Sequence, residues 1–115
     1  MRRLTSPIGM QQGSELLFSD FENDGPMWAG DGPRETRHRI EFATPFLAPP
    51  AVMLSLSMWD MDKGTNSRVD ISSDTVTGAG FWIVFRTWGD SRIARVRADW
   101  TAIGSLPDEE TWDVP

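Results

Sequence analysis

The chain has 115 residues, of which 39% are hydrophobic and 24% charged, enough for one globular domain with one core. The formal net charge of −6 excludes a global basic field for nucleic acid, and the absence of cysteine excludes disulfides, thiolate zinc sites and a cysteine nucleophile. We expect a single domain over residues 1–115, with a less ordered N-terminal segment at 1–13 and a less ordered acidic tail at 105–115.

The N-terminal residues Arg2 and Arg3 are positively charged, but no continuous apolar segment follows them as it does in a secretory signal. No apolar run in the chain approaches the length of a membrane span. We therefore expect no membrane insertion and no nucleic-acid partner. Cytoplasmic synthesis followed by retention, by display on a particle or by release through another route stays open.

Apolar residues recur at every second position between clusters of Gly, Pro, Asp and Asn, which is typical of an all-β protein. Glu22–Pro33 is expected to be a loop because it is rich in Gly, Pro and Asp. Six strands at short spacing predict a compact, six-stranded antiparallel β-sandwich. In chain order, the expected strands are Ser14–Phe18, Arg37–Phe42, Ala51–Trp59, Arg68–Val76, Phe81–Thr87 and Ala94–Ala102.

Two of these strands have clear faces, because successive side chains of a strand point to opposite sides. In the third strand the expected core face consists of Val52, Leu54, Leu56 and Met58. In the last strand it consists of Ala94, Val96, Ala98, Trp100 and Ala102. The opposite face of the last strand then carries Arg95, Arg97 and Asp99. From the residues alone, this charged face is either the solvated side of a sheet or a contact with a second subunit.

Candidates for catalysis or metal binding are few. The only histidine, His38, lies on the apolar face of an expected strand, which favours a packed core or interface residue over a general base. Asp60–Asn66 has oxygen-bearing side chains spaced as in a calcium loop, but Ile71 stands where the bidentate acid should be. We expect a non-enzymatic protein without metal or cofactor. We also expect a polar hairpin turn at this place, with Asp60 and Arg68 facing each other across two strands.

Trp88 ends a strand just before the turn Gly89-Asp90-Ser91, where an aromatic ring is expected at an edge of the fold. Such a ring either covers the end of the core or forms an apolar platform with polar groups beside it. The second arrangement suits a small amphipathic ligand such as a sugar.

Several short motifs follow one another along most of the chain, from about Asp31 to Gly104. In their order and spacing they resemble the H-type lectin domain family of invertebrate agglutinins and discoidin C-terminal domains. The motifs are Ile40-Glu41-Phe42-Ala43-Thr44-Pro45-Phe46, Pro49-Pro50-Ala51-Val52, Asn66-Ser67-Arg68-Val69, Gly80-Phe81, Thr87-Trp88 and Asp99-Trp100-Thr101-Ala102-Ile103.

This resemblance implies a homotrimer with binding sites for galactose or N-acetylgalactosamine in clefts between protomers, and a role in cell adhesion through glycan recognition. Asp31 matches the family's sugar-binding aspartate, Arg68 its arginine and Trp88 its tryptophan. With Gly89 and Asp90 these residues form the expected carbohydrate site. For a trimeric family, the charged face of the last strand becomes an expected subunit interface, made of Arg95, Arg97 and Asp99.

Two positions depart from the family pattern. Gly89 stands where the family often has a histidine, and Ala94 stands where it has a tyrosine. Asp90 and Ser91 are the candidates to replace the lost contacts. The alternative function is therefore a structural or assembly module of a phage-like or adhesive fibre. Such a module keeps the lectin fold with a degraded sugar site and has other fibre or particle proteins as partners.

Overall fold

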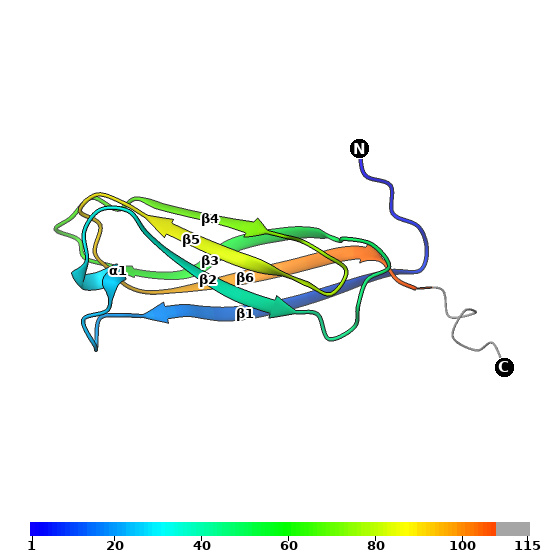
Figure 1. Cartoon of the computed structure of the whole chain (residues 1–115), viewed down its shortest axis with the longest axis horizontal. Coiled ribbons are helices and arrows are strands. Elements are labelled where there is room, and N and C mark those ends of the chain that lie inside the picture. The colour runs from blue at the N-terminus through cyan, green and yellow to red at the C-terminus, as the bar shows by residue number, and fades with distance from the viewer. Residues whose placement is uncertain (108–115) are drawn as a thin grey trace.

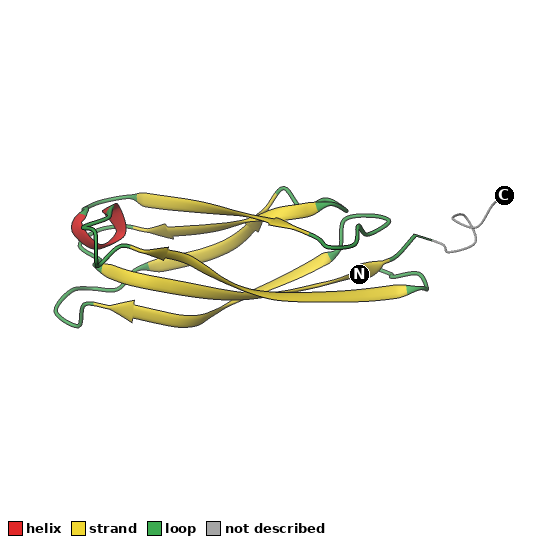
Figure 2. Cartoon of the chain, turned by 90° about the horizontal axis from the view of Figure 1, so that it is seen from below, coloured by secondary structure: helices red, strands yellow, loops and turns green. Residues whose placement is uncertain are grey.

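The computed structural model describes residues 1–107, which form two layers of β-strands (Figure 1, Figure 2). One helical turn, α1 (Pro26–Ala29), lies between the first two strands. The expected all-β, six-stranded antiparallel sandwich is confirmed. The strands are β1 (Ile8–Ser19), β2 (Arg34–Glu41), β3 (Ala51–Met61), β4 (Val69–Asp74), β5 (Gly80–Thr87) and β6 (Ile93–Ser105).

Each layer is a three-stranded sheet, one in the order β1-β6-β3 and the other in the order β2-β5-β4. All neighbouring strands are antiparallel. Because β6 and β5 are the central strands, both of their edges are covered by a neighbour. These two strands therefore contain most of the fully buried side chains.

The core lies between the sheets and is rich in aromatic rings. Phe42 packs against Phe46 and Phe81 with ring centroids 5.0 and 5.7 Å apart, and Phe81 lies 5.6 Å from Trp100. Burying a side chain of this size stabilises the fold by roughly 1.5–3 kcal/mol. The expected core position of Trp100 is confirmed. On β6 Val96, Ala98 and Ala102 belong to this cluster as well, Ala94 is buried outside it, and Ile93 joins it.

The expected core face of β3 is correct only for its first half. Val52, Leu54 and Leu56 pack against the core, but Met58 does not belong to it. A β-bulge between Leu56 and Met58 shifts the register with β6 and reverses the alternation. Met61 then packs against the core instead.

The ordered part of the chain begins earlier than expected. Strand β1 starts at Ile8, so the expectation of a less ordered segment over 1–13 is wrong for residues 8–13. Position 13 carries no apolar side chain for a physical reason. A Cβ atom on Gly13 would lie 2.4 Å from Nε1 of Trp100, so the indole ring of Trp100 occupies the space that such a side chain would need. At the other terminus, Leu106 packs against the core and its N–H donates to the carbonyl of Pro7 (2.8 Å). The remainder of the expected acidic tail, from residue 108, lies outside the described residues.

The loop expected over Glu22–Pro33 contains one regular turn, α1. Pro26 stands at the first position of this turn, where its missing N–H costs nothing. Met27 is buried, and its N–H donates to the Asp20 carboxylate (3.0 Å). Apart from α1 the segment is irregular, as its composition predicts.

The hairpin expected around Asp60–Asn66 is wrong, because β3 and β4 belong to different sheets. Residues 62–68 instead cross from one layer to the other. Asp60 and Arg68 therefore do not face each other. Asp60 pairs with Arg95 and Arg68 pairs with Asp90. Within residues 1–107, no helix has the length and apolar character needed to cross a membrane.

Candidate functional site

Three loops meet at the end of the sandwich where α1 lies (Figure 1). They comprise residues 20–33 before β2, residues 62–68 before β4 and residues 88–92 between β5 and β6. The N-terminus lies at the opposite end of the sandwich. All five residues expected in a carbohydrate site fall on these three loops. The fold therefore brings them to one end of the molecule.

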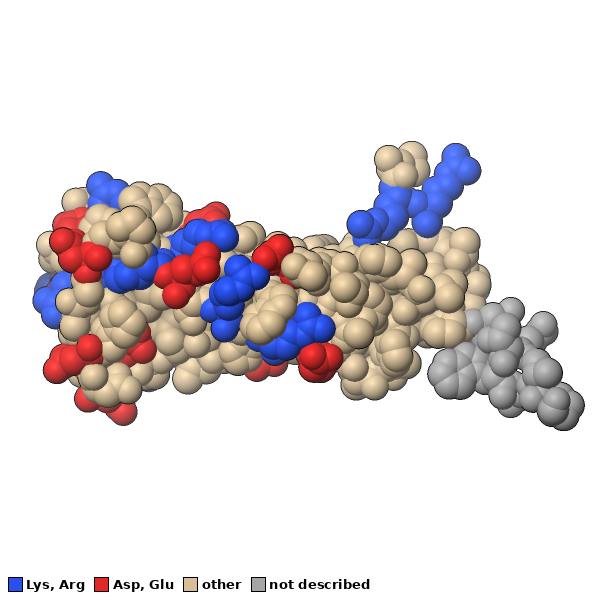
Figure 3. Space-filling model, in the orientation of Figure 1, with Lys and Arg blue, Asp and Glu red and all other residues tan. Residues whose placement is uncertain are grey.

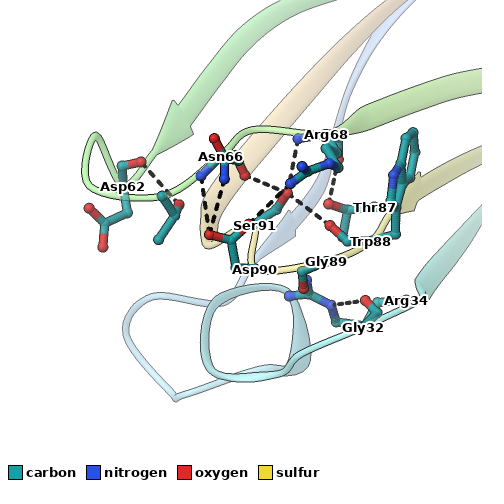
Figure 4. A network of polar contacts seen from close by, with 11 residues as sticks. Gly32, Arg34, Asp62, Asn66, Arg68, Thr87, Trp88, Gly89, Asp90 and Ser91 are labelled. Carbon is teal, nitrogen blue, oxygen red and sulfur yellow. Dashed lines mark hydrogen bonds and ion pairs between the residues drawn. The ribbon is translucent and has the colours of Figure 1, made fainter.

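An ion pair between Arg68 and Asp90 forms the centre of this loop end (Figure 4). Nη1 of Arg68 lies 3.1 Å from Oδ1 of Asp90, and both side chains are about half exposed. The other oxygen, Oδ2, accepts two long hydrogen bonds of 3.5 Å from the backbone and side-chain nitrogens of Asn66. The pair therefore presents a fixed donor and a fixed acceptor to solvent.

The side chain of Ser91 connects the 62–68 loop and the 88–92 loop by hydrogen bonds. It is fully buried, and its hydroxyl accepts a hydrogen bond from the N–H of Arg68 (2.9 Å). The same hydroxyl lies within donating distance of the carbonyls of Asn66 (2.8 Å) and Trp88 (3.1 Å). The buried hydroxyl of Thr87 donates to the carbonyl of Arg68. Ser91 is thus a support of the site and not the replacement ligand contact that the sequence suggested.

The loop before β2 is joined to the same end by backbone contacts. The N–H of Gly32 donates to the carbonyl of Gly89 (2.9 Å), and Nη2 of Arg34 lies 3.3 Å from that carbonyl. This contact places Asp31 beside the 88–91 turn. Asp31 is exposed, and its carboxylate has no hydrogen-bond partner among residues 1–107. It is therefore available to accept hydrogen bonds from a ligand.

Gly89 has a positive φ of 68°, a conformation that a residue with a Cβ adopts only at a cost. A Cβ atom at this position would lie 3.2 Å from Nη1 of Arg68. The departure from the family's histidine therefore has a local reason: in this turn a larger residue would be strained and would crowd the guanidinium. Ala94, the second departure, is buried, and its carbonyl accepts hydrogen bonds from the N–H groups of Asp20 and Phe21.

Trp88 is 43% exposed and borders a groove on the outer face of the β2-β5-β4 sheet. The groove has a volume of about 650 Å³, within the usual range of ligand pockets. Of the two interpretations of Trp88, a cover for the end of the core and a platform for a ligand, the groove favours the platform. Its lining residues are Pro33, Arg34, Glu35, Val69, Asp70, Arg86, Thr87 and Trp88.

The charge of Asp90 is fixed by its neighbours. Partial desolvation raises the pKa of this carboxyl, but hydrogen bonds from Asn66 and the backbone, together with the Arg68 charge, outweigh it. The pKa of Asp90 therefore lies below its ordinary value of 3.8. At neutral pH the carboxyl group of Asp90 is therefore ionised.

Arg95, Arg97 and Asp99 lie elsewhere, on the outer face of the β1-β6-β3 sheet. Each has a polar neighbour on an adjacent strand of the same chain. Nε of Arg95 lies 3.1 Å from Asp60, Nε of Arg97 donates to Oγ of Ser57 (2.9 Å), and Asp99 accepts from Oγ of Ser14 (2.7 Å). The expectation that this face is a subunit interface stays a prediction.

His38 lies at the edge of the sandwich where β1 and β2 run, and it is half-buried. Its Nε2 is 3.3 Å from the Glu15 carboxylate, so it joins the two sheets and has a structural contact. No cluster of three or more potential metal ligands occurs among the described residues.

The sequence did not predict two features of the candidate site, the supporting role of Ser91 and the direction of the Arg34 side chain. Ser91 is one serine among many, and nothing in the local pattern distinguishes a buried loop hydroxyl from an exposed one. Arg34 begins β2, yet its guanidinium turns back to the carbonyls of Pro26, Met27, Gly32 and Gly89. The only sequence signal for this role is an arginine directly after a Gly-Pro loop.

Comparisons with known proteins agree with the fold and with the motifs. The family model of the H-type lectin domain matches residues 37–103. A protein of Fuscovulum blasticum, named ATP synthase subunits region ORF 7, is 58% identical over 114 residues, which are 99% of each chain. A discoidin-1 chain of Dictyostelium discoideum is 32% identical over 74 residues, 64% of this chain and 29% of the discoidin.

Among solved structures, wild-type discoidin II of Dictyostelium discoideum has a similar fold, with a TM-score of 0.74 at 23% identity. The similarity covers 91% of this chain and 40% of the discoidin II chain. This chain therefore spans well under half the length of the discoidins that it matches. The family model covers more than half of the chain, including the 62–68 and 88–92 loops of the candidate site but not Asp31. The chain belongs to the H-type lectin domain family.

Proposed function

We propose that the loop end binds carbohydrate, in a non-enzymatic role, at a site formed by Asp31, Arg68, Trp88, Gly89 and Asp90. The observation that carries this proposal is the exposed indole of Trp88 beside the Arg68–Asp90 ion pair. A pyranose has one apolar face and several hydroxyls. An aromatic ring next to a charged donor and a charged acceptor complements both.

The proposed sugar is of the galactose or N-acetylgalactosamine type, in line with the family to which the chain belongs. In this role Trp88 packs against the apolar face or an acetyl group, and Arg68 donates hydrogen bonds to hydroxyls or to a carbonyl substituent. Asp31 accepts hydrogen bonds from hydroxyls. Asp90 orients Arg68, and Gly89 leaves room for the guanidinium.

We further propose that the protein is a homotrimer, with Arg95, Arg97 and Asp99 at the contact between subunits. Support comes from the two signs of charge on the outer face of β6, which a second copy can complement. One small sugar site binds weakly, and several sites on one assembly raise avidity without new contacts. Light scattering should give the mass of a trimer, and Arg97→Glu should shift it towards the monomer.

A glycan array followed by isothermal titration tests the sugar proposal. Galactose- or N-acetylgalactosamine-terminated glycans should bind, and Trp88→Ala should weaken binding by at least about tenfold because the stacking surface is lost. Trp82→Ala is the matched control, because Trp82 lies on the same strand β5 and is not part of the loop end. If no glycan binds the protein, and Asp31→Ala behaves like the wild type, the proposal is wrong.

The second candidate is a structural or assembly module of a fibre or particle. It is favoured by one observation, the absence of a side chain at Gly89, which leaves the site without the family's histidine contact. Under this alternative a tight protein partner is found by pull-down, its binding is insensitive to free sugars, and the array stays negative.

A further inference from the structure

The groove beside Trp88 extends away from the site proposed above. In the β2-β5-β4 sheet, one row of paired residues is Glu35, Arg86 and Asp70. Trp88 follows Arg86 by two residues, directly after the end of β5, and both residues line the groove. Arg68 and Asp90 lie on the loop side of Trp88, whereas Arg86 lies on the strand side. Trp88 thus separates two polar clusters.

The second cluster is built like the first, from one arginine and its acidic partners. Nε of Arg86 is 2.8 Å from Glu35, and Nη1 is 3.7 Å from Asp70. All three side chains are about half exposed, so their remaining donor and acceptor capacity faces the groove. The intervening row of Arg34, Thr87 and Val69 also lines the groove.

The charge of the groove is balanced. Two cations, Arg34 and Arg86, stand with two anions, Glu35 and Asp70. On this face of the molecule, basic and acidic side chains alternate and neither sign forms a patch (Figure 3). The whole chain carries a formal charge of −6. Neither a negatively nor a positively charged ligand gains from such a lining, whereas paired hydroxyls meet a donor and an acceptor side by side.

We propose that this groove is a second saccharide subsite, so that the protein recognises a neutral oligosaccharide of at least two residues. The inference rests on the proposed sugar-binding function and extends it. The first residue lies on the loop side of Trp88, and the next residue lies in the groove against Arg86, Glu35 and Asp70. The groove volume of about 650 Å³ exceeds what a single hexose fills.

Isothermal titration with defined sugars tests this subsite. The probes are methyl β-galactoside and methyl N-acetyl-α-galactosaminide, the neutral disaccharides lactose and N-acetylgalactosaminyl-α1,3-galactose, and the acidic trisaccharide 3′-sialyllactose. Each neutral disaccharide that binds should do so roughly tenfold more tightly than its monosaccharide, the gain expected from one or two added hydrogen bonds. Sialyllactose should bind no more tightly than lactose.

Two variants assign the gain to the groove. Arg86→Gln and Glu35→Gln should reduce the affinity for the disaccharide to that for the monosaccharide, while the affinity for the monosaccharide stays within about twofold. Arg39→Gln is the matched control, because this arginine lies on the same sheet face, is paired with Glu41 and does not line the groove. It should change neither affinity.

The outcomes separate the two proposals. If a monosaccharide binds and loses affinity in Trp88→Ala, but no disaccharide binds more tightly, the second subsite is wrong and the first stands. The same conclusion follows if the disaccharide gain survives both Arg86→Gln and Glu35→Gln. If none of the probes binds, the sugar site and its extension are both wrong.

Discussion

Two ion pairs of this molecule have nearly the same geometry but different supports. Arg68–Asp90 at the loop end and Arg95–Asp60 on the outer face of the β1-β6-β3 sheet each join atoms 3.1 Å apart. Strand register holds Arg95 opposite Asp60. Arg68 and Asp90 come from two separate loops, which no sheet ladder aligns.

The Arg68–Asp90 pair therefore depends on support from neighbouring residues that the Arg95–Asp60 pair does not need. The hydroxyl of Ser91 and the backbone conformation of Gly89 fix the distance between the two loops. An ion pair between exposed side chains contributes little to stability by itself. The comparison teaches that the Ser91 hydroxyl and the Gly89 backbone, and not the ion pair itself, hold the candidate site together.

Removing the buried support should have the largest effect on stability. Ser91→Ala leaves the N–H of Arg68 and the carbonyl of Asn66 without their partner, and we expect a loss of about 1–3 kcal/mol in the free energy of unfolding. Urea denaturation followed by tryptophan fluorescence measures it. Ser57→Ala, which removes the hydroxyl beside Arg97 on the strand face, should stay within about 0.5 kcal/mol. Equal losses in the two variants would contradict the comparison.

Adding a side chain to the turn should have the next largest effect. Gly89→Ala imposes a Cβ on a positive φ and crowds Nη1 of Arg68, so we expect a loss of about 1–2 kcal/mol, measured in the same way. Gly64→Ala is the control, because Gly64 lies in an exposed turn without a positive φ. A Gly89→Ala variant as stable as the wild type would show that the turn relaxes freely.

Neutralising one acid of each pair should affect stability little and should separate the pairs by function. Asp90→Asn is expected to weaken glycan binding by roughly tenfold, because the fixed acceptor and the orientation of Arg68 are lost. Asp60→Asn should leave glycan binding unchanged. Titration calorimetry with a glycan identified on the array measures both variants. A loss of binding in Asp60→Asn alone would move the site to the strand face.

The smallest expected effect is a dependence of stability on pH. The folded protein holds the pKa of Asp90 below its ordinary value of 3.8, so folding favours the charged form. The resulting stabilisation is fully present above that ordinary value and is lost as the pH falls through the lower folded value. The free energies of unfolding of the wild type and Asp90→Asn, from urea denaturation at a series of pH values, should therefore converge as the pH falls below the ordinary value of 3.8. Curves that stay parallel throughout would contradict the assignment.

Most of the fold prediction rested on two patterns, the alternation of apolar side chains and the positions of turn residues. They placed the strands that became β2 to β6, and they predicted the core faces of most of β6 and of the first half of β3. They failed at Met58, where a bulge reverses the alternation, and at residues 8–13, where Gly13 makes room for Trp100. In both cases the deciding contact is between strands, and no local pattern contains it.

The site residues were predicted from family motifs, and their positions in the fold show what the motifs could not. Arg68, Trp88, Gly89 and Asp90 lie together at one end of the sandwich, and their role in binding stays a prediction. The partners of Asp60 and Arg68 were wrong, because the sequence does not say that the chain changes sheets between β3 and β4. The sequence did not predict the groove at Arg86, because its lining residues come from three different strands.

The sequence by itself determined the all-β class, the strands β2 to β6 and the lectin family, because side-chain alternation and motif order are local properties of the chain. Only the tertiary structure decided which charges pair, which serine is buried and where the groove runs. These depend on the crossing between the two sheets and on strand register, which place residues far apart in sequence within a few ångströms of each other.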